Sequence, residues 1–194
     1  MVELPPSPVE GLRTVELTAD WEPELQRFFE ANPLYFLEVN GEPAGPNEAH
    51  EEIHGEFPTG WTFTKKWLVG YVDATNSLLA MANIVSDLLA PGVWHIGLLI
   101  VATRSHGTGL AQALYGSLES WARSNGAAWL RLGVVQGNAR AERFWESAGF
   151  TQTRTREGVE MGKRIHTLRV MVKPLSEEPL ERYLSRVPRD RPES

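Results

Sequence analysis

The chain has 194 residues, a length typical of a single domain with one packed core. Its 42% hydrophobic and 23% charged residues exclude a disordered or fibrous protein. The absence of cysteine excludes disulfide scaffolds, Cys-ligated zinc, iron–sulfur clusters and thiol nucleophiles. The formal charge of −6 argues against nonspecific nucleic-acid binding and fits a cationic small partner better.

The strongly apolar runs of the chain are short. The runs that begin at Leu78 and Ile96 fall well below the roughly 20 residues that span a bilayer, so we expect buried strands and no membrane partner. The acidic, proline-rich N-terminal segment lacks the basic start and apolar stretch of a signal peptide. We therefore expect a cytoplasmic protein.

The first half of the chain predicts one strand, two helices and then three strands. Residues 13–17 alternate as a strand does, and Asp20 is predicted to cap a helix that Pro33 ends. A second, short helix is expected after Asn47. Three apolar runs between residues 66 and 101, separated by turn residues, predict a strand meander.

The second half predicts helices that alternate with strands. Apolar residues at helical spacing follow a glycine-bearing loop and end at residues 125–126. Residues 129–135 predict a strand, residues 139–148 a helix capped by Asn138, and two final strands meet around residues 158–162. Because a helix between two strands of one sheet implies a parallel crossover, we expect an α/β (α+β) fold. Its sheet should be mixed and mostly antiparallel, with about seven strands.

The sharpest local feature is the strand, loop and helix within residues 95–115. Gly107 and Gly109, with a small residue at Ala111, allow backbone N–H groups to approach a ligand closely. The start of the helix adds the positive end of its dipole, so this is a predicted anion site suited to phosphate. The spacing is neither that of a P-loop nor GxGxxG, and a tight turn that simply requires glycine is the alternative.

Read together with residues 138–150, this loop resembles the GNAT superfamily of acyl-CoA-dependent N-acyltransferases. In that family a Q/R-x-x-G-x-G/A loop cradles the pyrophosphate, and an Asn-x-x-Ala-x-x-Phe-Tyr/Trp helix ends in Gly-Phe. The matching positions here are His106, Gly107, Thr108, Gly109, Leu110, Ala111, Asn138, Ala141, Phe144, Trp145, Gly149 and Phe150. The likeness covers about residues 66–173 and implies a single GNAT-like domain. We set that domain at residues 13–173, between a flexible N-terminus, 1–12, and a charged, proline-containing tail, 174–194.

The resemblance implies acetyl-CoA as the acyl donor and no metal. By family analogy, the backbone of residues 99–101 pairs with the pantetheine and polarises the acetyl carbonyl. Arg140 is a further candidate for the 3′-phosphate, although solvated surface arginines are the alternative, and Asn138 can act as an ordinary helix cap. The expected cofactor-binding residues are Leu99, Ile100, Val101, Arg104, His106, Gly107, Thr108, Gly109, Leu110, Ala111, Asn138, Arg143 and Trp145.

Two positions depart from the family pattern. His106 stands where Gln or Arg is usual, so a fixed cation at the pyrophosphate is missing unless Arg104 substitutes or His106 is protonated. Trp145 stands where many members keep a Tyr general acid. A thiol with a pKa near about 8.5 is a tolerable leaving group, so the acid is water or is absent.

His95 is the candidate general base. An amine acceptor is cationic at pH 7 and must lose a proton before it attacks a thioester. Some family members place a catalytic Glu eleven residues before the loop position that His106 occupies, and His95 stands at that place. The alternative is a strand histidine bonded within the sheet. Among the tryptophans, Trp61 and Trp67 are candidate walls of the acceptor pocket.

A competing motif lies at residues 50–54, where His50, Glu51 and His54 match HExxH. On a helix this spacing offers two zinc ligands and a general base. The helix is short, so a polar surface helix is the plainer interpretation. A third interpretation lets Glu48, Glu51, Glu52 and the two histidines border the acceptor site and attract an ammonium group.

The sequence therefore predicts an acetyl-CoA-dependent N-acetyltransferase that acts on a primary amine in a ternary complex. The acceptor is a small molecule or a peptide, with no nucleic acid or membrane partner. A catalytically silent acyl-CoA-binding module, suggested by Trp145, is the alternative, and a zinc hydrolase is the remote one. The acceptor identity, a homodimer and the role of the tail remain open.

Overall fold

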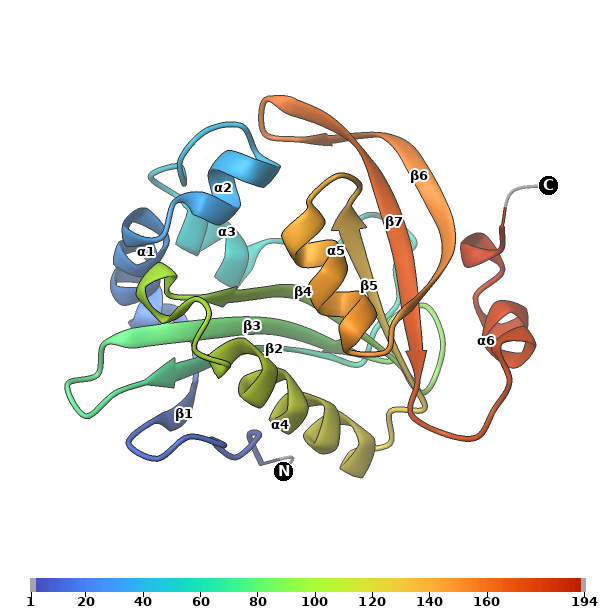
Figure 1. Cartoon of the computed structure of the whole chain (residues 1–194), viewed down its shortest axis with the longest axis horizontal. Helices are drawn as coiled ribbons and strands as arrows, with labels where there is room; N and C mark the ends of the chain where they lie inside the picture. The colour runs from blue at the N-terminus through green and yellow to red at the C-terminus, as the bar shows by residue number, and fades with distance from the viewer. Residues whose placement is uncertain (1–2, 193–194) are drawn as a thin grey trace.

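The computed structural model describes residues 3–192 and contains one seven-stranded sheet in the order β1-β2-β3-β4-β5-β7-β6 (Figure 1). Neighbouring strands are antiparallel except for the parallel pair β4–β5. The strands are β1 (Arg13–Glu16), β2 (Lys65–Val72), β3 (Leu78–Ser86), β4 (Val93–Val101), β5 (Trp129–Val135), β6 (Thr151–Met161) and β7 (Arg164–Pro174).

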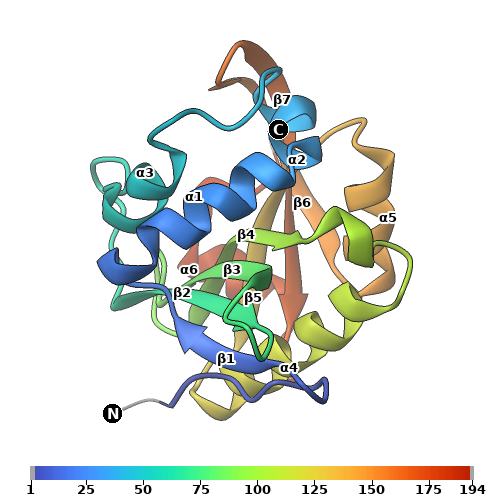
Figure 2. The ribbon, with the colours of Figure 1, turned by 90° about the vertical axis from the view of Figure 1, so that its left-hand side faces the viewer.

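Helices cover both faces of this sheet, as the side view shows (Figure 2). One face packs against α4 and α5, and the other packs against α1 to α3 over β1–β4 and against α6 over β5 and β7. The helices are α1 (Glu22–Ala31), α2 (Leu34–Val39), α3 (Glu48–His54), α4 (Leu110–Ser124), α5 (Ala139–Ser147) and α6 (Leu180–Arg186). Among residues 3–192, no helix combines the length and the apolar character needed to cross a membrane.

The predicted mixed, mostly antiparallel sheet with one parallel crossover is confirmed. Asn138 caps α5 as expected, because its side chain accepts a hydrogen bond from Ala141 N at 3.1 Å. The prediction that Asp20 caps the first helix is wrong. Asp20 lies in a short 3-10 turn, and α1 begins at Glu22 with Pro23 in its first turn. The short helix α2 was not predicted as an element.

The two ends of the chain lie against the domain. Near the N-terminus, Trp121 Nε1 donates to Glu3 O at 2.7 Å and Ser117 Oγ donates to Pro6 O at 2.6 Å. Near the C-terminus, Tyr183 is fully buried against Trp129, with ring centroids 5.2 Å apart. Both ends of the described chain are thus in contact with the sheet or its helices, while the domain limits themselves remain a prediction.

The parallel pair β4–β5 separates soon after it forms. Its register runs only from Val93–Trp129 to His95–Arg131, although β4 continues to Val101 and β5 to Val135. The register between β3 and β4 also shifts beside Gly97, which marks a bulge. The second half of β4 therefore has a free edge on the side of β5.

The β6–β7 hairpin reaches across the molecule to α2 (Figure 1). His166 Nε2 lies 2.6 Å from Val39 O, Lys163 N donates to Asn40 O at 2.8 Å, and Arg164 Nη1 donates to Glu38 O at 3.0 Å. We call this contact the hairpin clasp. It links the two halves of the sheet on either side of the opening between β4 and β5.

Candidate functional site

A groove of about 1100 Å³ opens beside the free edge of β4. Its walls come from the end of β4, the loop and first turn of α4, one side of α5, and α2. The lining residues are Asn32, Leu34, Tyr35, Glu38, Leu99, Ile100, Val101, Thr103, Ser105, His106, Gly107, Gly109, Leu110, Ala111, Gln112, Asn138, Ala139, Arg140, Ala141, Arg143, Phe144, Trp145 and Ser147.

The loop at the mouth of the groove needs its glycines for backbone geometry. Gly107 and Gly109 have φ angles of +78° and +85°, a region that residues with a Cβ rarely adopt. A Cβ at either position would meet no atom within 4 Å, so these residues face open space. Among residues 3–192, no carbonyl accepts from the N–H groups of Ala111 and Gln112 in the first turn of α4. The loop thus presents free N–H donors where an anion would bind.

The free edge of β4 presents a second set of backbone groups. Along an antiparallel pair, the backbone N–H and C=O groups of successive residues point alternately toward the partner strand and away from it. Just after the end of β4, Ala102 N donates to Leu79 O of β3. The backbone groups of Leu99 and Val101 consequently point away from β3, toward the opening. The carbonyl of Val101 already accepts from His106 Nε2 at 2.9 Å, whereas Leu99 has no such partner among the described residues.

Most of the predicted cofactor residues are brought together here, but two are not. Arg104 and Thr108 do not line the groove; Thr108 borders a smaller cavity of about 400 Å³ against residues 9–12. His106 lines the groove with its imidazole turned onto Val101 O, so it fixes the loop to the end of β4. The α2 residues were missed, because a six-residue helix is too short to show a hydrophobic period.

Positive side chains on α5 flank the groove. Arg140 and Arg143 are exposed and line it, and Glu38 is the lining carboxylate opposite them. Trp145 also lines the groove, and the rest of its side chain is buried. Its ring centroid lies 5.5 Å from that of Tyr115 and 5.3 Å from that of Phe150. Trp145 therefore forms an apolar wall, with no acidic proton to give.

His95 lies on the opposite side of the sheet, at the point where β4 and β5 separate. Burial, together with the nearby charge of Arg131, lowers the pKa of His95 to about 3. Arg131 Nη1 lies 3.4 Å from His95 Nδ1, which places an N–H donor against that nitrogen. His95 is consequently a neutral imidazole at pH 7, with its Nδ1 lone pair directed at the guanidinium.

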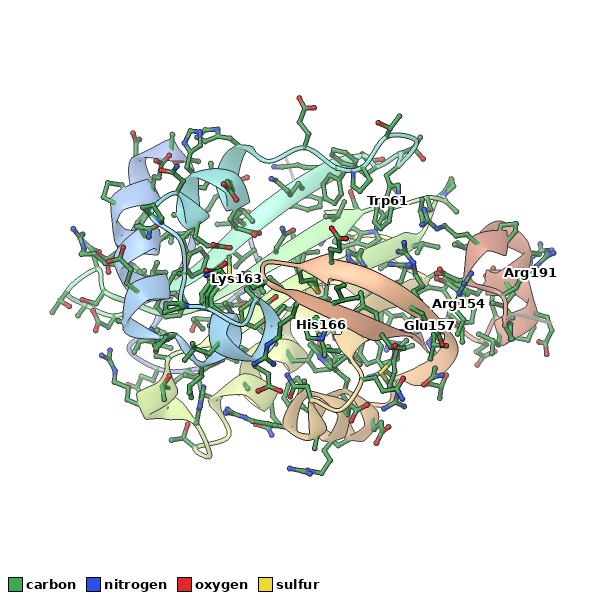
Figure 3. The ribbon with its side chains drawn as sticks, turned by 90° about the horizontal axis from the view of Figure 1, so that it is seen from above. Trp61, Arg154, Glu157, Lys163, His166 and Arg191 are labelled. Carbon is green, nitrogen blue, oxygen red and sulfur yellow. The ribbon has the colours of Figure 1, made fainter. Side chains whose placement is uncertain are left out.

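An aromatic and cationic cluster stands over His95. The Trp61 ring lies 6.5 Å from His95 between centroids and is flanked by the guanidinium carbons of Arg131 at 5.7 Å and Arg189 at 4.8 Å. Trp61 and Arg154 both lie toward the end of the molecule that α6 covers (Figure 3). Trp67 is buried in the core and stacks on Trp94, so its predicted place in the acceptor pocket is wrong.

On the face covered by α1 to α3, the side chain of Glu52 on α3 bonds to the sheet. Its Oε1 accepts from Asn83 Nδ2 at 2.5 Å, and the Asn83 amide packs against Gly97 at the β4 bulge. Burial raises the pKa of the Glu52 carboxyl above its usual range. Of the acidic and histidine residues expected near the acceptor, Glu52 is therefore the one whose contacts lead to β4.

The HExxH histidines lie away from the groove. Neither His50 nor His54 lines it, and both face Glu22 of α1 on the molecular surface.

The sequence profile of the acetyltransferase (GNAT) family matches residues 9–150. The chain belongs to this family. Its members use acyl-CoA as donor, and the zinc-hydrolase alternative finds no support. No curated protein sequence matches the chain.

Solved structures similar to this GNAT chain share its fold at low identity. An acetyltransferase from Thermus thermophilus is 21% identical with a TM-score of 0.65, covering 86% of this chain and 99% of its own. The spermidine N-acetyltransferase from Vibrio cholerae, in complex with CoA and spermine, is 15% identical with a TM-score of 0.64, at 86% and 96% coverage. The ribosomal-protein-S18-alanine N-acetyltransferase from Escherichia coli is 16% identical with a TM-score of 0.62, at 87% and 96% coverage.

Proposed function

We propose that this chain transfers an acetyl group from acetyl-CoA, bound in the groove, to a primary amine. The observation that carries the proposal is the meeting of three features in one groove. The glycine loop with the free N–H groups of α4 suits a pyrophosphate, Arg140 and Arg143 suit further phosphate, and the free edge of β4 suits an extended amide chain.

The residues of this chain are proposed to bind and polarise the donor. Acetyl-CoA supplies a thioester whose C–S bond is replaced by a C–N bond to the amine. The Leu99 N–H points into the opening and is placed to donate to the acetyl oxygen, where negative charge develops. Trp145 and Leu110 give the groove an apolar wall that excludes water.

His95 remains the proposed catalytic residue, in a role that its environment defines. A group with a pKa of about 3 does not hold a proton at pH 7, and Arg131 already donates to its Nδ1, so His95 is proposed to position the acceptor molecule through its Nε2–H as a neutral imidazole. The amine then loses its proton to water and attacks as a free base. The absence of an acidic proton on Trp145 fits a thiolate that leaves without a protein acid.

The acceptor is proposed to enter on the face that carries His95 and Glu52, opposite α4 and α5. Glu52 supplies negative charge beside Gly97, which suits an ammonium group approaching the bulge. The hairpin clasp spans this face between β7 and α2. A small amine or the end of a peptide chain therefore fits better as the acceptor than an amine on the surface of a folded protein. A homodimer and a cytoplasmic location remain predictions.

Titration calorimetry with acetyl-CoA tests the donor site, using two glycine substitutions. Gly109→Glu should abolish binding, because a carboxylate at φ +85° would occupy the pyrophosphate position. Gly126→Glu is the matched control, since Gly126 also has a positive φ, +94°, is exposed and would place its Cβ in open space outside the groove. Equal binding by both variants would refute the donor site.

Thiol release with a panel of primary amines then separates an enzyme from a silent acyl-CoA-binding module. Amine-dependent thiol release by the wild-type chain, absent in Gly109→Glu, supports the transferase. Tight acetyl-CoA binding without release from any amine in a broad panel would favour the silent module.

A further inference from the structure

The HExxH segment has a second feature that acyl transfer does not use. His50 and His54 stand one turn apart on α3, with ring centroids separated by 4.6 Å. Glu22, at the start of α1, directs Oε2 between them, 3.1 Å from His50 Nδ1 and 3.5 Å from His54 Nε2. Ligand atoms of all three residues lie within 4.8 Å of one another. Among residues 3–192, no other group of three His, Asp or Glu side chains converges in this way.

We propose that Glu22, His50 and His54 form a binding site for a divalent transition-metal ion of the zinc class, which cross-links α1 to α3. This proposal differs from the expectation that no metal is bound, which the family resemblance implied. The site is separate from the groove and independent of the proposed acyl transfer.

Two of the three distances between ligand atoms fit tetrahedral coordination, and the third, between the two histidine nitrogens, is within 4.8 Å. Zinc lies about 2.0–2.1 Å from imidazole nitrogen and carboxylate oxygen, so two ligand atoms of a regular tetrahedron are about 3.3 Å apart. The two measured Glu22–histidine separations, 3.1 and 3.5 Å, lie on either side of that value. Two imidazoles and one carboxylate are also a ligand set that zinc binds with three protein groups.

The surroundings of the three residues indicate a metal site that links α1 to α3 and leaves one coordination position to water. The three side chains are 36–58% exposed, so water can complete the coordination. The glutamate of the motif, Glu51, is exposed and outside the converging group. A water bound here would face solvent, which removes the enclosed cleft that a hydrolase needs.

The structural consequence concerns α3, which is short. It has seven residues, no side-chain N-cap bond, and Ala49 as its one fully buried residue. Gln26 of α1 already joins the two helices by accepting from Ala49 N at 3.0 Å. A metal at Glu22, His50 and His54 would replace the Glu22–His50 contact by a coordinate link, on the helix that carries Glu52 to the sheet.

The test uses tag-free full-length protein, stripped of metal by chelation, and Zn²⁺ alone as the probe. We expect one zinc per chain by calorimetry, and a rise in Tm on saturation. Glu22→Gln, His50→Ala and His54→Ala should each weaken zinc binding by about tenfold or more. Glu51→Gln, in the same helix and motif, is the matched control and should bind zinc as the wild type does.

Binding of Co²⁺ reports on the coordination of the metal, which a change in stability does not. Co²⁺ should give visible absorption bands typical of low coordination number, and these should vanish in the His50→Ala/His54→Ala double variant. Circular dichroism checks that the variants stay folded, as expected for exposed side chains. Failure of the wild type to bind zinc, or equal binding by the double variant, would overturn the site.

Discussion

Arg131 on β5 and Asp190 near the C-terminus form a buried bidentate ion pair. Arg131 Nε lies 2.7 Å from Asp190 Oδ2 and Nη2 lies 3.0 Å from Oδ1, with side chains 3% and 0% exposed. Tyr183 donates to the same carboxylate at 2.5 Å. Burial alone would raise the pKa of Asp190, but the hydrogen bonds and charge of Arg131 outweigh it and hold that pKa below its usual range. The end of the chain therefore sets the position of the guanidinium that contacts His95.

Replacing Asp190 by Asn should strongly destabilise the protein. It leaves the Arg131 guanidinium buried without its counter-charge, and the expected loss is about 3–5 kcal/mol in the free energy of unfolding. Urea unfolding measures this loss. Arg186→Gln is the control, since its ion pair with Glu178 is partly exposed and should contribute less than about 1 kcal/mol. Equal effects of the two substitutions would contradict the prediction.

The low pKa of His95 should make stability depend on pH. The unfolded chain protonates His95 near pH 6.5, whereas the folded chain does so near about pH 3. Below pH 6.5 the unfolded state therefore binds a proton that the folded state lacks, and stability falls by up to about 1.4 kcal/mol per pH unit. Between pH 7 and pH 5 this contribution amounts to roughly 2 kcal/mol.

His95→Gln isolates that contribution, because every other titrating group is shared with the wild type. The difference in unfolding free energy between the two proteins, measured in urea at pH 5 and pH 7, should shift by about 2 kcal/mol in favour of the variant at the lower pH. Parallel pH dependence of the two proteins would show that His95 titrates normally.

The same pKa shapes the expected activity profile. Since His95 is neutral throughout pH 5–8, kcat/KM of the wild type should show no acidic limb that belongs to it. His95→Gln should lower the rate without changing the shape of the profile. A limb with a midpoint near about 6.5 that disappears in the variant would restore His95 as a general base.

The hairpin clasp should be sensitive to a single methyl group at Gly162. A Cβ there would lie 2.6 Å from Asn40 Cβ and 2.7 Å from Asn40 O. Gly162→Ala should cost about 1–3 kcal/mol more than Gly158→Ala in the free energy of unfolding and should raise the KM for the amine. Gly158 is a matched control because its φ is also positive, +67° against +56°, and its Cβ would meet open space. Equal stability of the two variants would show that the hairpin clasp can adjust to the added methyl group at no cost.

Charge at the groove should come from α5 rather than from the loop after β4. Arg140→Gln and Arg143→Gln should each weaken acetyl-CoA binding by roughly tenfold, as expected for loss of one charged hydrogen bond of about 1.5 kcal/mol. Arg104→Gln should leave it unchanged, because Arg104 does not line the groove. Calorimetry with acetyl-CoA at two salt concentrations measures the affinities of the three variants. A large loss of affinity in Arg104→Gln would show that the loop after β4 also supplies positive charge to the groove.

The sequence by itself determined the parts of this protein that are local. Gly107 and Gly109 demand left-handed backbone, Asn138 caps the helix that follows it, and alternating or helical apolar patterns define the elements. These features depend on neighbours a few residues away. They sufficed to predict the mixed sheet and an anion site at the loop, whereas the family resemblance implied that α5 belongs to the same site.

Only the tertiary structure decided the contacts between distant segments. The pairing of Arg131 with Asp190 spans 59 residues, that of His50 with Glu22 spans 28, and that of His166 with Val39 spans 127. No periodic pattern encodes which charged side chains meet across a sheet, because each meeting depends on the packing of whole elements. The role proposed for His95 changed for that reason, since desolvation and a neighbouring guanidinium, rather than its place in a motif, lower its pKa.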